Sequence, residues 1–315
     1  MAQPTHSEVQ AVDPVLTNIL VAYMQADDRF IASRLFPSVS IPTQSATFYK
    51  FTKKYWFSDN LKKRAPGGEF ARNGYSVTTD TVLAALWGLE HPIADEVRAN
   101  NQMPMDLERA GLQWLAQQSL IRKELAFASD FFVNGVWGTT DNNSATDWDD
   151  NTSGHPITDV LTARRTISNN TGYDANTLAV GYIVHQAIIN HPDVLDRVKY
   201  VSTATQANVE SAVAACFGLT NYIVAKASYN SANEGQTFSA LPIVDDDALV
   251  CYVSPTPGVM SASAGYTFAW DGGGGLGSIG MYRDQSAKSD VLQHSESWDQ
   301  KAVATDLGYL FLDIV

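Results

Sequence analysis

Two β-forming segments enclose a polar, basic stretch in the first third of the chain, and this arrangement restricts the possible folds most. Residues 45–59 (SATFYKFTKKYWFSD) and 74–93 (GYSVTTDTVLAALWGLEHPI) are rich in β-branched and aromatic residues, and the stretch between them carries Gly, Pro and cations. The pattern predicts a long hairpin with a basic tip. Because a two-stranded hairpin is marginal alone in water, its edges and aromatic side chains need a partner surface. These aromatic residues are Phe48, Tyr49, Tyr55, Trp56 and Phe57.

The residues before this hairpin resemble an extended arm. Apolar residues in DPVLTNILVAYM (13–24) follow helical spacing and predict one short helix, and Pro37 and Pro42 end the helical pattern further on. An arm of this kind has little core of its own, so we expect it to lie on another surface.

The charges are divided unevenly along the chain. Residues 1–74 contain nine basic and six acidic residues, a balance of +3, whereas the remainder contains 12 basic and 28 acidic residues, a balance of −16. This division suggests contacts between copies of the chain as readily as contacts with phosphate, although a single lysine is most often simply solvated. The candidates for inter-subunit contacts are Lys53, Lys54, Trp56, Lys62, Lys63, Arg64 and Arg72.

The basic stretch KFTKKYWFSDNLKKR also interleaves aromatic residues with lysines, a pattern that suits single-stranded nucleic acid. Against that interpretation stand a sequence pI near 4.7 and the lack of a recognised binding module. We therefore favour docking of the basic tip on an acidic protein surface.

Residues 103–132 (MPMDLERAGLQWLAQQSLIRKELAFASDFF) predict a long helix. Pro104 suits its first turn, Asp106 and Glu108 suit the positive end of the helix dipole, and apolar residues recur at spacings of three or four. A helix of this length forms a rod of roughly 40 Å at 1.5 Å per residue. Such a rod is typical of the spine of a domain.

The rest of the chain mixes helices and strands, which predicts an α+β fold with antiparallel strands closing the C-terminal third. A turn-rich surface loop is expected over residues 138–156. Helices are expected near residues 157–173, in two pieces on either side of His191–Pro192, and before Gly218. The predicted strands are NTLAVGY, NYIVAKASYN, ALVCYVS, YTFAWDG, SIGMYRD and the segment from Ser289 to the C-terminus.

No pattern in the sequence predicts catalysis, a cofactor or a metal site. His185 and His191 are six residues apart, so they do not share one helical face as the i, i+4 metal pair does, and we interpret them as structural. Asp245–Asp247 has the composition of a solvated turn. The run GGGGLG (272–277) leads into a strand pattern rather than a helix, which removes the dinucleotide-binding mechanism and leaves a flexible hairpin turn. Cys216 and Cys251 lie in apolar stretches as expected for free thiols.

Composition places the chain among folded globular proteins. At 315 residues, 45% of them hydrophobic, it is long enough for one large or two modest domains that bury roughly 75% of the unfolded surface. Polar residues interrupt every apolar run before it reaches membrane-spanning length, and the N-terminus lacks the pattern of a signal peptide. We expect a protein that is made and kept in a cytosol.

The order of these segments resembles that of the major capsid proteins of tailed bacteriophages, which have the Hong Kong 97-like fold. The resemblance spans essentially the whole chain. It is carried by the arm, the basic hairpin and the spine helix, followed by ANTLAVGYIVHQAIINHPDVLDRVKY, TQANVESAVAACFGLTNYIVAKASYN, DDDALVCYVSPTPG, SAGYTFAW and the closing segment from Arg283.

The resemblance implies a division of the chain. Residues 1–45 would be the N-terminal arm and residues 46–92 the extended E-loop hairpin. Residues 93–154 and 271–315 would form a peripheral domain with the spine helix 103–132, and residues 155–270 would form the axial domain.

The resemblance also implies a function, which is self-assembly through pentamers and hexamers into the icosahedral or prolate shell of a virion. Such a shell encloses double-stranded DNA without sequence-specific binding and is assembled in the bacterial cytoplasm, with scaffold, portal and decoration proteins as further partners. The protein would be neither an enzyme nor bound to a membrane. Hinges are expected at Gly67–Gly68 and near the glycines at 272–275.

Two properties of some family members, an attached scaffold segment and a crosslink from a loop lysine, are not predicted for this chain. It begins with arm-like sequence, so a scaffold would be separate or already removed, and no partner can be assigned for a loop-lysine crosslink. The alternatives are an encapsulin-like compartment that encloses a cargo enzyme and a soluble hydrolase built on scattered Ser, His and Asp residues.

Overall fold

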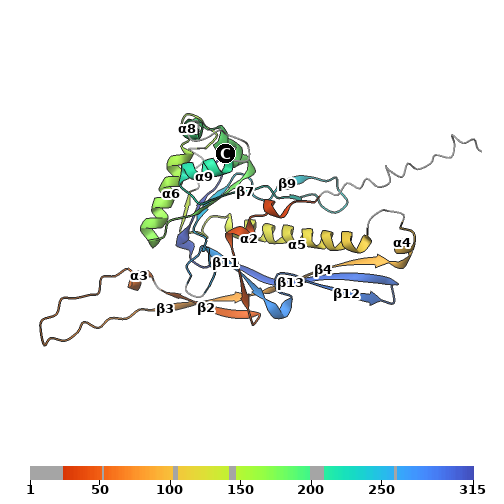
Figure 1. Cartoon of the computed structure of the whole chain (residues 1–315), viewed down its shortest axis with the longest axis horizontal. Coiled ribbons are helices and arrows are strands. Elements are labelled where there is room, and N and C mark those ends of the chain that lie inside the picture. The colour runs from red at the N-terminus through yellow and green to blue at the C-terminus, as the bar shows by residue number, and fades with distance from the viewer. Residues whose placement is uncertain (1–23, 52, 102–105, 142–146, 199–208, 259–260) are drawn as a thin grey trace, which may run out of the picture.

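The computed structural model describes residues 24–51, 53–101, 106–141, 147–198, 209–258 and 261–315. Its helices and mixed sheets confirm the α+β class. One part of the molecule holds a sheet with α6, α8 and α9, another holds α5 alongside a second sheet, and the β2–β3 hairpin extends away from both (Figure 1). Within the described ranges, no helix is both long and apolar enough to cross a bilayer.

The first sheet, here called the core sheet, has the strand order β5-β14-β10-β6-β7. Its central strands β6 and β10 are buried at every residue, because apolar side chains cover both faces. Helix α6 packs on β10 and β14, and α9 packs on β7. The elements are β5 (Thr139–Asp141), α6 (Pro156–Thr171), β6 (Thr177–Gly181), α7 (Tyr182–Asn190), α8 (Pro192–Val198), α9 (Val209–Phe217), β7 (Asn221–Ala225), β10 (Ala248–Cys251) and β14 (Gly308–Phe311).

The helices of this part agree with the sequence predictions. The break between α7 and α8 falls at His191, and Pro192 begins the new helix. Helix α9 ends before Gly218, whose φ of 65° lies in the left-handed region that glycine adopts without strain. The expected start of this last helix, before Val209, lies outside the described residues.

The second sheet, here called the long sheet, has the order β1-β11-β13-β12, with β4 also paired to β13. Helix α5 lies against it, and a Cβ placed at Gly111 would come within 2.7 Å of the His91 ring. Leu115 of α5 packs with Ile93 and Leu292 of the sheet. The elements are β1 (Ser38–Ile41), β4 (Ala85–Ala94), α4 (Asp95–Ala99), α5 (Leu107–Phe131), β11 (Gly265–Trp270), β12 (Ser278–Asp284) and β13 (Ser289–Ala302).

The predicted spine helix is confirmed as α5, which has 25 residues. It begins one residue after Asp106, whose carboxylate accepts the backbone N–H of Glu108 at 3.0 Å and so caps the helix. Pro104, which was expected in the first turn, lies outside the described residues.

The prediction that residues 1–45 have little core of their own is wrong for residues 30–36, here called the arm segment. Ile31, Leu35 and Phe36 are at most 1% exposed and belong to the main hydrophobic core. The segment includes the short helix α2 (Ala32–Leu35) and continues into β1, which pairs in parallel with β11. The arm segment therefore lies on its own subunit. The short helix expected at residues 13–24 lies outside the described residues except for Met24.

The hairpin also differs from its prediction. Strand β2 (Ser45–Phe51) is followed by the single-turn helix α3 (Lys53–Trp56). The segment expected as one strand over 74–93 forms two strands, β3 (Val77–Leu83) and β4, on either side of the buried Ala84. Only β3 pairs with β2, whereas β4 pairs with β13. Residues 82–87 (VLAALW) are all apolar and include no turn residue, so the sequence contains no signal for the change of partner.

Three further predictions need correction. The strands predicted to close the C-terminal third do not all belong to one sheet, because β14 joins the core sheet. Residues 138–156 are not simply a surface loop, since β5 pairs with β14 and Trp148 is 1% exposed; residues 142–146 lie outside the described part. The glycine run is no hairpin turn, because β11 and β12 both pair with β13. The division into arm, hairpin, peripheral and axial domains remains a prediction.

Candidate inter-subunit surface

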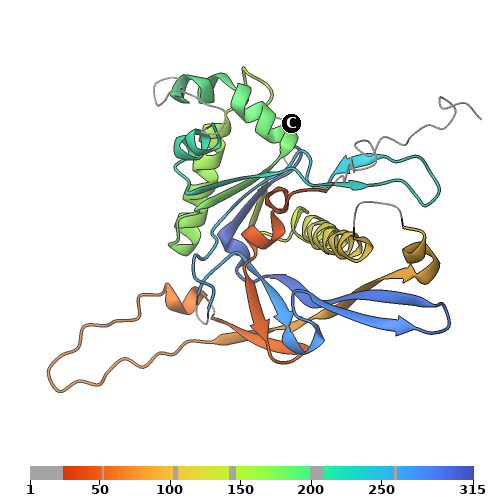
Figure 2. The same ribbon diagram turned by 45° about the vertical axis from the view of Figure 1, so that its right-hand side comes forward.

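The hairpin is anchored to the subunit mainly at its base. Strands β2 and β3 pair from Ser45–Leu83 at the base to Phe51–Val77. Val82 belongs to a small cluster with Ile41, Ala84, Tyr266 and Phe268, and the Phe48 ring stacks on Phe268 with 5.7 Å between ring centres. This cluster fixes the direction in which the hairpin leaves the body (Figure 2).

Beyond the base, the hairpin loop (residues 53–76) is open to solvent. Every residue in it is exposed except Gly68, which is intermediate. Trp56 is 58% exposed, Phe70 75% and Leu61 94%. Tyr55, Phe57 and Tyr75 are exposed as well. Large apolar side chains in this density on a projecting loop indicate a contact surface rather than a solvated turn.

The seven predicted contact residues all lie on this loop, but they differ in their surroundings. Lys53 binds its own subunit, because its ammonium lies 2.6 Å from the carboxylate of Asp306. The Arg64 guanidinium donates to the Gly68 carbonyl at 2.7 Å and stacks 4.0 Å above the Phe70 ring. The Trp56 ring lies 6.2 Å from that of Tyr75.

The remaining predicted cations project into solvent. The structure shows no ion pair for Lys54, Lys62, Lys63 or Arg72 within the part of the chain it describes, and all four are exposed. Their positive charge is therefore available to an external acidic surface. Their role as inter-subunit contacts, and that of the other three residues, remains a prediction.

The long sheet carries further exposed apolar residues that sequence reasoning missed. Ile279 and Met281 of β12 are each 63% exposed, and Leu86 of β4 is 62% exposed. The composition of these segments indicated strands. It does not tell which face of a strand a helix covers, and in the structure these side chains remain exposed.

An ion-pair network joins β12 and β13 of the long sheet to the helices α4 and α5. Arg283 of β12 binds Asp95 of α4 and Asp290 of β13, and Arg98 binds Asp290 and Glu108 of α5. These interactions hold the carboxyl pKa values of Asp95 and Asp290 below their ordinary range, chiefly through the arginine hydrogen bonds.

The histidines serve the framework of the subunit. His185 Nδ1 lies 2.9 Å from the Tyr222 hydroxyl, and burial lowers the pKa of the imidazole. The buried His191 accepts the backbone N–H of Asp193 at 3.2 Å, at the start of α8. Each ring therefore has a structural partner.

In the aspartate run at 245–247, Asp245 is exposed as expected for a solvated turn, whereas Asp246 and Asp247 are partly buried. Burial, together with the charges of Asp246, Asp313 and Asp245, raises the pKa of Asp247 to about 6. In the described ranges no group of three or more His, Cys, Asp or Glu residues is arranged to hold a metal ion.

Comparison with curated proteins finds one relative. No protein-family model matches the chain. The chain is 24% identical over 197 residues to the major capsid protein of Burkholderia phage BcepMu, a match that spans 62% of this chain and 62% of that protein.

Solved structures match over nearly the whole length. A phage-related protein from Bordetella bronchiseptica RB50 has a TM-score of 0.67 at 23% identity, with 96% of this chain and 97% of that chain covered. The capsid of cyanophage P-SCSP1u has a TM-score of 0.59 at 14% identity, covering 93% and 90%. The encapsulin SrpI of Synechococcus elongatus PCC 7942 has a TM-score of 0.54 at 10% identity, covering 100% and 96%.

Proposed function

We propose that this chain, which has the Hong Kong 97-like capsid fold, is the major capsid protein of a tailed bacteriophage and assembles with its own copies into the DNA-containing shell. The observation that carries the proposal is the hairpin loop, whose large aromatic side chains and whose cations Lys54, Lys62, Lys63 and Arg72 are exposed to solvent. A second copy of the chain supplies the missing surface. The named relative and the shared fold support the same role.

Assembly follows from the shape of the subunit. A projecting loop that binds a different patch on the next copy makes a head-to-tail contact, and such contacts generate rings when the rotation closes. Pentamers and hexamers of this kind build a shell, and interfaces of roughly 2,000–5,000 Å² are expected for obligate assembly. The loop cations and the acidic remainder of the chain favour this pairing.

The protein acts through contacts rather than catalysis. With a net charge of −13 it would bind DNA phosphates weakly, which suits a container that holds DNA without reading its sequence. Assembly in the bacterial cytoplasm with scaffold, portal and decoration proteins belongs to the same proposal.

An encapsulin-like compartment is the second candidate, and the structural likeness to the SrpI encapsulin favours it. The contents of the particle separate the two functions. A phage capsid protects double-stranded DNA, whereas a compartment holds a cargo protein.

Negative-stain electron microscopy of the purified full chain tests the proposal. We expect closed shells of uniform size, because the loop is satisfied only when every copy has a neighbour. Nuclease-protected DNA in particles from infected cells would support the capsid role, and a co-purifying enzyme the compartment. Particles of only one to four chains at high protein concentration would contradict both.

A further inference from the structure

One buried carboxylate joins the arm segment to the spine helix. Glu124 of α5 is 1% exposed, and its oxygens accept the backbone N–H of Ile31 at 2.9 and 3.0 Å and that of Ala32 at 2.9 Å. Helix α2 has no capping side chain of its own at Ile31, so Glu124 provides the cap from a position more than 90 residues away. The carboxylate therefore helps to hold the start of α2 against α5.

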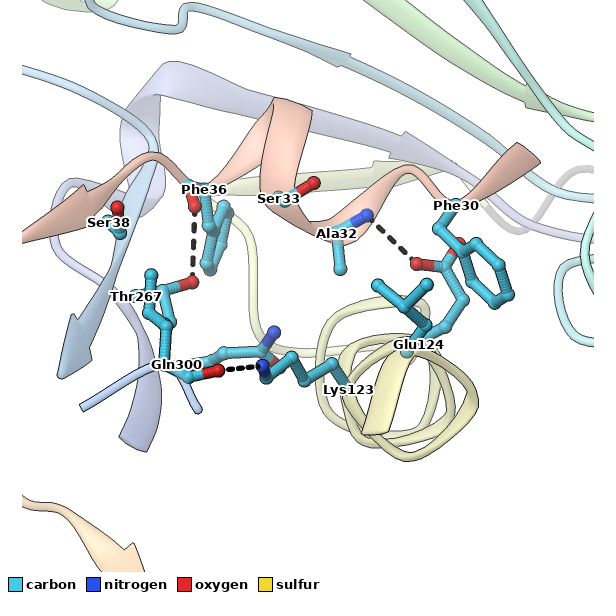
Figure 3. Close-up of a pocket in the computed structure, with 11 residues that line it drawn as sticks. Phe30, Ala32, Ser33, Phe36, Ser38, Lys123, Glu124, Thr267 and Gln300 are labelled. Carbon is cyan, nitrogen blue, oxygen red and sulfur yellow. Dashed lines mark hydrogen bonds between the residues drawn. The ribbon is translucent and has the colours of Figure 1, made fainter. Parts of the chain in front are cut away.

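Glu124 has no cationic partner among the described residues. The neighbouring Lys123 is turned away from it, with its ammonium 2.6 Å from Glu296 and 3.0 Å from the Leu276 carbonyl. In Figure 3, the Glu124 carboxylate points to the backbone of Ala32, whereas the Lys123 side chain points away from it, in the direction of Gln300. An unpaired charge at such a buried position is costly, and protonation removes that cost.

The other titratable groups near the contact between the arm segment and α5 either interact with groups other than Glu124 or are exposed. His294 of β13 lies 3.7 Å from Glu296, and the Tyr266 hydroxyl of β11 donates to the Ser261 carbonyl. Arg29 and Arg34 of the arm are exposed. Burial is the main influence on Glu124, and it outweighs the two backbone N–H groups, raising the pKa of the carboxyl from 4.5 to about 7.

A cavity of about 140 Å³ lies next to the carboxylate. Its walls include Phe30, Ala32 and Phe36 on the arm side, Glu124 on α5, and Thr267 and Gln300 on the long sheet (Figure 3). The arm segment and α5 are therefore incompletely packed beside the proton-binding group. This space gives the joint room to move and Glu124 a route to exchange its proton.

We propose that Glu124 makes the joint between the arm segment and the spine helix proton-sensitive, so that acid holds the arm segment in place and alkali loosens it. This is a property of the single subunit, whatever the subunit assembles into. It links proton binding to the position of the arm that continues toward the N-terminus.

The direction of the pH effect follows from the pKa of Glu124 in the two arrangements of the arm segment. When the arm segment leaves α5, Glu124 meets water and returns to its ordinary pKa near 4.5, whereas in the seated arrangement its pKa is about 7. The seated arrangement therefore binds the proton more tightly, and its added stability is complete below pH 4.5. That stability is lost as the pH rises through 7, and opening becomes up to about 300-fold more favourable.

Hydrogen exchange of full-length Glu124→Gln against the wild type tests the proposal, because glutamine mimics the protonated side chain. At each pH the two proteins share the same intrinsic exchange chemistry. We expect residues 30–36 to exchange only about fourfold faster in the wild type at pH 5 and up to about 300-fold faster at pH 8.5. Glu108→Gln on the same helix is the control, since Glu108 is half-exposed and paired with Arg98. It should leave this exchange unchanged.

Infrared difference spectra of the same proteins report protonation directly. We expect the wild type to show a carboxylic-acid C=O band that disappears as the pH rises through about 7. The Glu124→Gln variant should lack this band. If Glu124→Gln does not fold, exchange of residues 30–36 in the wild type is compared with that of buried β6 in the same molecule. A flat ratio between pH 5 and 8.5, or a carboxyl that titrates in the ordinary range, overturns the proposal.

Discussion

Replacing residues 60–72 with a short Gly-Ser linker is expected to abolish shell assembly and leave the subunit folded. These residues are exposed apart from Gly68, and the interactions seen within them, such as Arg64 with Phe70, are local to the loop. Removing them exposes no core, so the thermal unfolding midpoint should stay within a few degrees. Shell yield should fall at least about tenfold, because even one interface hot spot is worth about 2 kcal/mol or more.

Sedimentation velocity measures the yield and circular dichroism measures the fold. A full-length variant with Lys62, Lys63, Arg64 and Arg72 all changed to Gln separates charge from shape. It should assemble less well than the wild type, and the difference should shrink at high salt, which screens exposed charges. Unchanged shell yield in the linker variant would show that the loop is not a contact surface.

Phe36→Ala is expected to lower the free energy of unfolding by about 3–5 kcal/mol, the usual cost of removing a buried aromatic ring. The Phe36 ring is 1% exposed and lies 4.9 Å from Phe127 and 4.6 Å from Phe131, centre to centre. It also covers Gly265 so closely that a Cβ there would lie 2.2 Å from the ring. Urea unfolding of the soluble subunit measures the loss.

The matched control is Phe70→Ala, which removes the same ring from an exposed position. It should leave the urea midpoint unchanged and reduce assembly. An unchanged midpoint for Phe36→Ala would mean that the arm segment does not belong to the subunit core.

Elements with a strong local pattern were predictable from the sequence. Helix α5 has apolar residues at spacings of three and four and an acidic N-cap, and the α7–α8 break has a proline at the first helical position. The overall order of segments also identified the fold. For the two helical features the signal lies within one stretch of the chain, whereas the order of segments involves the whole chain.

Features that depend on distant partners were not predictable in this way. The arm segment is rich in apolar side chains, but nothing within it indicates that Phe36 packs against Phe127, Phe131 and Trp137 of the same subunit. Likewise, nothing within residues 74–93 indicates that β4 pairs with β13. The cap by Glu124 could not be predicted for the same reason, because Glu124 is far in the sequence from Ile31 and Ala32, whose N–H groups it accepts.

The candidate contact surface was predictable in part. Composition identified the basic tip and its aromatic residues, since their type and density are local properties. It did not reveal that Lys53 pairs with Asp306 in its own subunit, nor that β12 presents Ile279 and Met281 to solvent. These facts follow from how the chain packs.

The most direct test of the assembly mechanism asks on which copy the loop lies. Isotopically light and heavy subunits are mixed before assembly and joined with a carbodiimide, which links lysine amines to carboxylates in direct contact, and the linked peptides are identified by mass spectrometry. If the loop binds a neighbouring copy, Lys62 and Lys63 will be joined to acidic residues in light–heavy pairs at the statistical proportion. If every such link joins peptides of the same isotope, the loop folds back on its own chain and the proposed assembly contact does not exist.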